Sequence, residues 1–168
     1  MSRPDSIDGI REQWSVQRPD LDSSGVAITD RIFALAKHLD RRAVQVLEPL
    51  VLSPWAFDVL AALRRQGAPY RLTPTELSRA TLLTSGAMTN RLDRLEAQGL
   101  VRREADPGDR RGVRVVLLAG GVDLVDRALA LRFAESVEAT AALSLAEGRT
   151  LESLLRRLLL EFEHERNT

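Results

Sequence analysis

The 168-residue chain contains no cysteine and only two histidines, His38 and His164. The absence of cysteine excludes disulfides, thiolate zinc sites, cysteine nucleophiles and thiol-based redox sensing. Neither histidine has a serine or an acidic partner at the spacing of a catalytic motif, and the sequence has no glycine-rich phosphate loop. We therefore expect a protein that is not an enzyme, with no catalytic residues, no cofactor and no metal site.

Long apolar runs are also missing. No segment approaches the roughly 18–20 apolar residues of a membrane span, and the polar, acidic start MSRPDSIDGI is unlike a signal peptide. We therefore expect a cytoplasmic protein that does not bind membranes. With 44% hydrophobic and 29% charged residues, the chain can bury a core and remain soluble. Its length predicts one domain, or one domain with helical extensions.

The net charge is zero, but the charge is distributed unevenly. Residues 79–114 carry eight arginines against five acidic residues, whereas residues 115–168 carry six against nine. Zero net charge excludes a globally basic, histone-like protein, while a local excess of arginine is what a nucleic-acid-contacting element needs. By itself, this excess is better explained as a solvated charged surface.

Helical periodicity predicts flanking helices at both ends of the chain. At the N-terminal end these cover residues 7–17 and 25–47, and at the C-terminal end residues 120–142 and 146–165. The last helix carries more apolar surface than one small domain buries, so we expect it to form a subunit interface. Its apolar residues are Leu151, Leu154, Leu155, Leu158, Leu159 and Phe162.

Shorter elements are predicted between these helices. Ser53 and Pro54 provide an N-cap and a first helical residue, and Thr73 forms a capping box with Glu76. The segment TSGAMTNRLDRLEAQGL predicts a second helix of a helix-turn-helix, which ends at Gly99. The runs VRREA and VRVVLL around an Asp-Pro-Gly-Asp turn then predict a β-hairpin whose tip carries Asp109, Arg110 and Arg111.

The segment from Ser53 to Leu117 resembles the MarR family of winged-helix transcription regulators. The most specific element is the Asp-Arg-Arg wing followed by a β-run, shortly after the Gly-Leu-Val that closes the helix-turn-helix. One departure is Leu118, where the family usually has a threonine that caps the next helix. The resemblance implies a mainly α fold with a small β-wing, in which a winged helix-turn-helix is flanked by N- and C-terminal dimerisation helices.

In this family such a chain forms a single domain, here residues 1–168. The resemblance assigns residues 1–50 to the N-terminal helices, which contribute to dimerisation and the ligand pocket. It assigns residues 51–118 to the winged helix-turn-helix and residues 119–168 to the C-terminal dimerisation helices.

Several segments are similar to the urate-responsive, PecS-type branch of this family. They are the extra N-terminal helix, the Arg-Pro-Asp-Leu-Asp connector at residues 18–22, Trp-Ala-Phe-Asp at residues 55–58 and Thr-Asn-Arg at residues 89–91. This resemblance implies a coupling role for Arg103, near the first wing strand. The ligand-binding residues that it implies are Trp14, Asp58, Arg91 and, two turns after the aspartate, Gln66.

The second helix of the helix-turn-helix carries two kinds of face. At about 100° per residue, Met88, Leu92 and Leu95 lie together and predict a buried stripe. The other side is small, hydrogen-bonding or cationic, which suits a major groove, where Asn pairs with adenine and Arg with guanine. An ordinary polar face explains this helix equally well until the wing is considered. The residues expected to contact DNA are Ser85, Gly86, Thr89, Asn90 and Arg94.

Arginines on the hairpin suit the narrow, electronegative minor groove, although arginines at a turn are often merely solvated. We expect Arg110 and Arg111 to bind there, with Asp109 holding Arg111 in position. Arg102 and Arg103 are expected to contact phosphates, which position a protein without specifying sequence.

Asp58 and Arg91 are unusual for their positions. Asp58 interrupts an apolar helix, and Arg91 lies beside the buried stripe. From spacing alone, a structural ion pair is the better explanation, and Trp14 is more typical of an interface anchor. The family resemblance favours a planar heterocycle instead, with Asp58 accepting a ring N–H, Arg91 facing an oxyanion and Trp14 as an aromatic wall.

The sequence therefore predicts a homodimeric transcription repressor that binds a pseudo-palindromic double-stranded DNA operator. A small anionic aromatic ligand, urate or a related purine, is expected to relieve this binding. One alternative is a regulator of the same family that responds to a different effector, such as a phenolic carboxylate, or to none. Another is a helical protein-interaction module without DNA binding.

Overall fold

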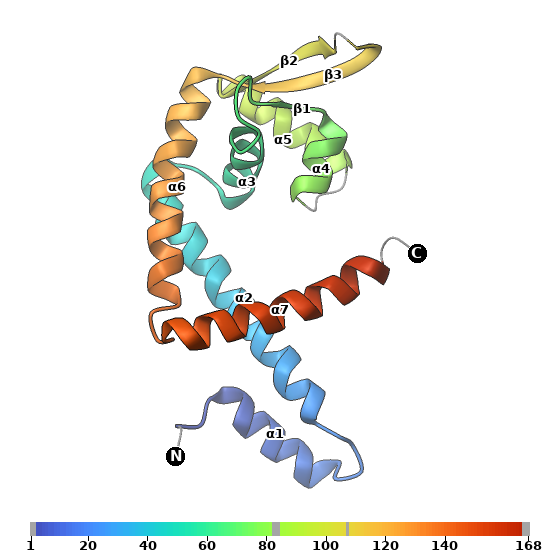
Figure 1. The fold of residues 1–168 in the computed structure, drawn as a ribbon, viewed down its shortest axis with the longest axis vertical. Coiled ribbons are helices and arrows are strands. Elements are labelled where there is room, and N and C mark those ends of the chain that lie inside the picture. Colours follow the sequence, from blue (N-terminus) through green and yellow to red (C-terminus); the bar gives the residue numbers. More distant parts are fainter. Residues whose placement is uncertain (1–2, 82–84, 107, 166–168) are drawn as a thin grey trace. The chain divides into compact units, whose positions relative to one another are not determined.

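The computed structural model describes residues 3–81, 85–106 and 108–165. Its contacts divide the chain into two compact units, residues 1–45 and 46–168, and each is described by itself. The chain is mostly helical with one small antiparallel sheet (Figure 1), as the sequence predicts.

No single helix in the described ranges is long and apolar enough to cross a membrane. The consecutive helices over residues 24–50 and 54–64, with a bend between them, meet that criterion as a pair, by length and composition only.

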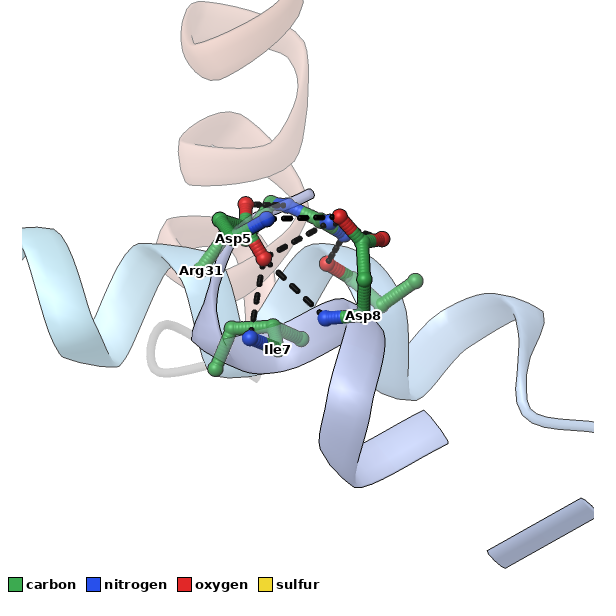
Figure 2. Close-up of polar contacts among 5 residues, drawn as sticks. Asp5, Ile7, Asp8 and Arg31 are labelled. Carbon is green, nitrogen blue, oxygen red and sulfur yellow. Dashed lines mark hydrogen bonds and ion pairs between the residues drawn. The ribbon is translucent and has the colours of Figure 1, made fainter. Parts of the chain in front are cut away.

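The first unit contains α1 (Ser6–Gln17) and most of α2 (Ser24–Leu47). Asp5 begins α1 with a capping box: its carboxylate accepts from the backbone N–H groups of Ile7 and Asp8, and Asp8 accepts from the N–H of Asp5. Arg31 of α2 donates to both carboxylates, at 2.8 Å from Asp5 Oδ2 and 2.7 Å from Asp8 Oδ1 (Figure 2). The start of α1 is therefore bound to the first half of α2.

The second unit contains the remaining elements in a helix-strand order typical of a winged helix. After a 3-10 turn (Glu48–Leu50) come α3 (Pro54–Arg64), β1 (Arg71–Leu72), α4 (Pro74–Thr81), α5 (Ser85–Ala97), β2 (Val101–Asp106), β3 (Asp109–Leu117), α6 (Ala119–Ala139) and α7 (Leu145–Glu165). The strands lie in the order β1-β3-β2, and β3 pairs with both neighbours in antiparallel register.

Strand β1 was not predicted from the sequence. It is only two residues long, and it exists because Arg71 and Leu72 pair with Val116 and Val115 of β3. A two-residue segment has no period of its own, so the partner strand decides its conformation.

The core of the second unit is formed by α3, α4, α5, the sheet and α6. Its largest fully buried residues are Leu47, Leu60, Leu63, Leu77, Met88, Leu92, Leu95, Val59, Val101, Val115 and Val125. The first turn of α6 approaches β2 closely at Gly121, where a Cβ atom would collide with the carbonyl oxygen of Leu100. Only glycine permits this approach, which brings α6 against the start of the wing.

The helix caps agree with the sequence in part. Thr73 and Glu76 form the predicted capping box at α4, with the Glu76 carboxylate 2.7 Å from the Thr73 backbone nitrogen. Ser53 occupies the N-cap of α3, but its side chain makes no capping hydrogen bond, and Leu118 provides no polar cap to α6. Burial of the apolar faces of α3 and α6, rather than their caps, therefore holds these two helices in place.

Candidate nucleic-acid interface and ligand site

Helix α5 has one buried face and one face open to solvent. Met88, Leu92 and Leu95 are at most 1% exposed, which confirms the buried stripe. The backbone of Ser85 begins the helix, but its side chain lies outside the described residues. The other predicted DNA-contacting residues of α5 are all exposed: Gly86, Thr89, Asn90 and Arg94.

Arg103 ties the first wing strand to α5. Its guanidinium lies 2.6 Å from Asp93 Oδ1 and 2.6 Å from Glu96 Oε2, and its backbone N–H donates to Glu96 Oε1 at 2.8 Å. Two carboxylates face this one cation, so its charge is used within the protein rather than held open for a phosphate. Arg103 therefore joins the first wing strand to α5.

The turn of the wing is organised by Asp106. Its carboxylate accepts from Arg114 Nε at 2.7 Å and from the backbone N–H of Gly108 at 2.9 Å. These hydrogen bonds, the arginine's first, lower the pKa of Asp106. Sequence reasoning did not single out this pair, although an Asp two residues before a Gly is typical of a turn closed by its own side chain.

The predicted wing residues lie at the start of strand β3, directly after the turn residue Gly108. The backbones of Asp109, Arg110 and Arg111 are part of β3, where Asp109 pairs with Asp106 of β2. The pairing of β2 with β3 is irregular here, because the register shifts between Ala105, which pairs with Val113, and Asp106. The three side chains lie outside the described residues. Arg102, on β2, is exposed and ion-paired with Glu104.

Asp58 is more accessible than an apolar helix suggests, since its side chain is exposed while Ala56, Val59 and Leu60 around it are buried. The atoms packed around the carboxylate nevertheless desolvate it and raise its pKa. Arg132, Arg91 and Arg65 oppose that increase. Asp58 thus interacts electrostatically with Arg91 of α5, Arg132 of α6 and Arg65, the residue that follows α3.

Arg91 points towards α3, as its position beside the buried stripe predicts. Its guanidinium carbon lies 5.3 Å from the centre of the Trp55 ring, a cation–π distance. Arg132 lies similarly over Phe57, at 6.0 Å, and binds Glu135 Oε2 at 2.7 Å. Two cations therefore border the exposed carboxylate of Asp58 on aromatic supports, an arrangement that suits a ligand with both a donor and an anionic group.

The two remaining predicted ligand residues have different surroundings. Gln66 lies beyond the last residue of α3, where its amide donates to the carbonyl oxygen of Ala62 at 3.2 Å and so closes that helix end. Trp14 belongs to the first unit and is 56% exposed. Among the described residues, no group of three or more His, Asp or Glu side chains is arranged to hold a metal ion.

Comparison with known proteins identifies the fold and the family. The model of the MarR family matches residues 52–112. The chain is 34% identical to the HTH-type transcriptional regulator PecS of Dickeya dadantii, over 94% of this chain and 95% of PecS.

Solved structures agree with this relationship. A mutant of MarR from Escherichia coli in complex with operator DNA matches with a TM-score of 0.73 and 32% identity, over 82% of this chain and 96% of that one. BpsR of Bordetella bronchiseptica, whose DNA binding is regulated by 6-hydroxynicotinic acid, matches with a TM-score of 0.62 and 26% identity, over 76% and 98%. The chain therefore belongs to the MarR family of DNA-binding transcription regulators.

Proposed function

We propose that this protein is a homodimeric repressor that leaves a pseudo-palindromic operator when it binds a small anionic aromatic ligand, urate or a related purine. The observation that carries this proposal is the exposed polar face of α5, braced to the wing by Arg103. An exposed polar helix joined to the wing supports DNA binding by both elements together.

DNA recognition would divide between the helix and the wing. Asn90 and Arg94 of α5 read base edges in the major groove, and Ser85, Gly86 and Thr89 allow the helix to approach closely. Arg110 and Arg111 enter the adjacent minor groove, with Asp109 orienting Arg111. Arg102 contacts a phosphate. In a dimer, two such helices lie about 34–36 Å apart, one turn of DNA.

Dimerisation is supported by the apolar face of α7. Leu151, Leu154, Leu155, Leu158, Leu159 and Phe162 are 41–62% exposed in the single chain. A contiguous apolar face of this kind marks an interaction surface in a water-exposed protein. A second copy of the chain would cover it and would also supply the two-fold symmetry that a pseudo-palindrome requires.

The ligand response would begin at Asp58 and Arg91, with Trp14 and Gln66 as further contacts. Asp58 would accept a ring N–H, while Arg91 would turn from Trp55 to the ligand oxyanion. Because Arg91 lies on α5, the ligand would favour a placement of α5 that does not fit DNA, and Arg103 would pass that change to the wing. Ligand and DNA then prefer different states, as such a switch requires.

A gel-shift titration on the DNA upstream of the protein's own gene tests this proposal. We expect a shift that weakens steeply with salt, because phosphate contacts release counterions, and that urate reverses. A shift that is indifferent to urate would contradict the effector, and no shift at low salt would contradict the repressor. Arg91→Gln should keep the shift and lose its reversal by urate.

A further inference from the structure

The wing hairpin contains a bulge at the position of its arginines. Ala105 of β2 pairs with Val113 of β3, whereas the next residue, Asp106, pairs with Asp109. Residues 110–112 of β3 therefore lie between these two pairs, and we call them the bulge. Extra residues on one strand bend that strand and re-aim its side chains. Two of the three bulge residues are the arginines proposed to enter the minor groove.

The carboxylate of Asp106 bonds a residue on each side of this bulge. Its Oδ1 atom accepts from the backbone N–H of Gly108, before the bulge, at 2.9 Å. Its Oδ2 atom accepts from Nε of Arg114, after the bulge, at 2.7 Å. The Asp106 side chain is only 9% exposed, and a carboxylate this well covered depends on such partners. One side chain therefore connects the two ends of the bulge where the strand pairing is irregular.

Arg114 binds Asp106 although another carboxylate lies closer in the register. Glu104 is directly opposite Arg114 on β2, but it forms an ion pair with Arg102. Arg114 instead reaches its diagonal neighbour Asp106, a separation that long side chains can span. The hydrogen bond from Arg114, ahead of that from Gly108, lowers the pKa of Asp106, which is therefore ionised at neutral pH. The guanidinium of Arg114 is thus engaged within the protein.

We propose that Asp106 is a positioning residue for operator binding, because its bonds to Gly108 and Arg114 hold the bulge in the shape that admits the wing arginines to the minor groove. Arg114 acts through Asp106 and makes no essential contact with DNA. A wing that is ordered before binding loses less conformational freedom in the complex, which favours affinity. This inference rests on the wing contact in the proposed function and adds two residues that support it.

The charge of Asp106 by itself predicts the opposite effect. A carboxylate near DNA repels the phosphates, so the removal of its charge would strengthen binding to every duplex if repulsion were its only effect. A positioning role predicts weaker binding to the operator and no weakening on non-specific DNA, which is bound through its phosphates. A purely structural role would lower the amount of folded protein and weaken binding to both duplexes.

The experiment measures the affinity of the full-length protein for two labelled duplexes by fluorescence anisotropy, at one fixed salt concentration. One duplex is an operator that the wild-type protein selects from a random pool, and the other is a scrambled sequence of the same composition. The variants are Asp106→Ala, Asp106→Asn, Arg114→Gln and the combination of the last two. Glu104→Gln, which removes a different carboxylate of the same strand, is the matched control. Thermal unfolding confirms that each variant is folded.

We expect Asp106→Ala to weaken operator binding about tenfold, the loss of one specific contact. Asp106→Asn should weaken it less, because an asparagine still accepts from Gly108 but loses the charge-assisted bond to Arg114. Arg114→Gln should match Asp106→Asn, and the combined variant should be no weaker than either, since both changes break the same bond. Glu104→Gln should bind the operator at least as tightly as the wild type.

Three results would overturn the inference. The first is operator binding by Asp106→Ala that equals or exceeds that of the wild type. The second is an equal loss of affinity for the scrambled duplex in this variant. The third is a further loss when Arg114→Gln is added to Asp106→Asn, together with weaker binding to both duplexes, because Arg114 would then contact a phosphate by itself.

Arg111→Ala distinguishes the failure of this inference from the failure of the proposed function. If Arg111→Ala weakens operator binding and Asp106→Ala does not, the inference is wrong and the wing contact stands. If neither variant weakens it, the wing contact in the proposed function is wrong as well. In the Arg111→Ala background, Asp106→Ala should cost less affinity than in the wild type, because Asp106 acts through the arginines that it positions. The test uses no effector, so it does not depend on the response to urate.

Discussion

Helices α5 and α7 carry similar apolar stripes and bury them very differently. Leu92 and Leu95 of α5 are at most 1% exposed, whereas Leu158 and Leu159 of α7 are 43% and 57% exposed. Both helices belong to the second unit, so the difference lies in what faces them. The α5 stripe packs against α4 and β2 of its own chain, while the α7 stripe is exposed in the single chain.

This comparison separates two uses of the same pattern. An amphipathic helix needs a partner surface, and the periodicity of the sequence does not specify whether that surface belongs to the same chain. The winged helix buries its apolar stripe within its own chain and leaves its polar residues exposed. In the proposed dimer, a second chain covers the stripe of α7.

The largest expected effect comes from removing a buried side chain from the apolar stripe of α5. Leu95→Ala should lower the free energy of unfolding by about 2–5 kcal/mol, since it removes a fully buried side chain and leaves a cavity. Denaturant titration measures this change. Leu159→Ala, in the exposed stripe of α7, is the comparison variant and should lower the free energy of unfolding less. An equal decrease, at protein concentrations that keep the chain monomeric, would show that α7 is also packed within its own chain.

The next effect concerns the stripe of α7. Leu155→Glu combined with Leu158→Glu should halve the mass observed by sedimentation velocity, because two buried, unpaired carboxylates oppose a second copy. The helical signal per chain should change little. Glu163→Gln on the same helix should leave the mass unchanged, and a double variant that remains dimeric would place the dimer interface elsewhere.

A smaller effect is expected from the wing. Arg111→Ala should weaken operator binding about tenfold, by the loss of one specific contact worth roughly 1–3 kcal/mol, with the mass of the protein unchanged. Fluorescence anisotropy with labelled operator DNA measures this affinity. Arg157→Ala on α7 is a charge-matched control, and if both variants bind DNA like the wild type, the wing assignment is wrong.

The smallest effects are opposite pH dependences of stability at Asp58, on α3 beside α5, and at Glu147, at the start of α7. Burial raises the pKa of Asp58, so the folded state holds a proton more tightly than the unfolded state, and stability falls as pH rises from the ordinary value towards the raised one. The Asp58→Asn variant does not titrate at this position. Its free energy of unfolding relative to the wild type should therefore increase as pH rises through that window.

Glu147, at the start of α7, should behave in the opposite way. The hydroxyl and backbone N–H of Ser144 lower its pKa, so its contribution is present above the ordinary value of 4.5 and is lost as pH falls. Glu147→Gln should therefore cost stability at neutral pH and little in acid. Unfolding midpoints between about pH 3 and pH 8 measure both slopes, and slopes of the same sign would contradict one of the two assignments.

Local sequence patterns predicted much of the fold. The predicted limits of the flanking helices agree with α1, α2, α6 and α7 within a few residues, and the capping box at Thr73 is present. The buried stripe of α5 was also predicted correctly. These features depend on residues three or four apart, which always lie on one face of a helix.

The sequence by itself thus determined the helices, their apolar faces and the arginine-rich position of the wing. The tertiary structure alone decided strand β1, the contact of Arg103 with Asp93 and Glu96, and the stacking of Arg91 on Trp55. Each of these depends on groups brought together by chain folding at distances that no helical or strand period specifies. Periodicity states which side of an element is apolar, whereas packing determines which element it meets.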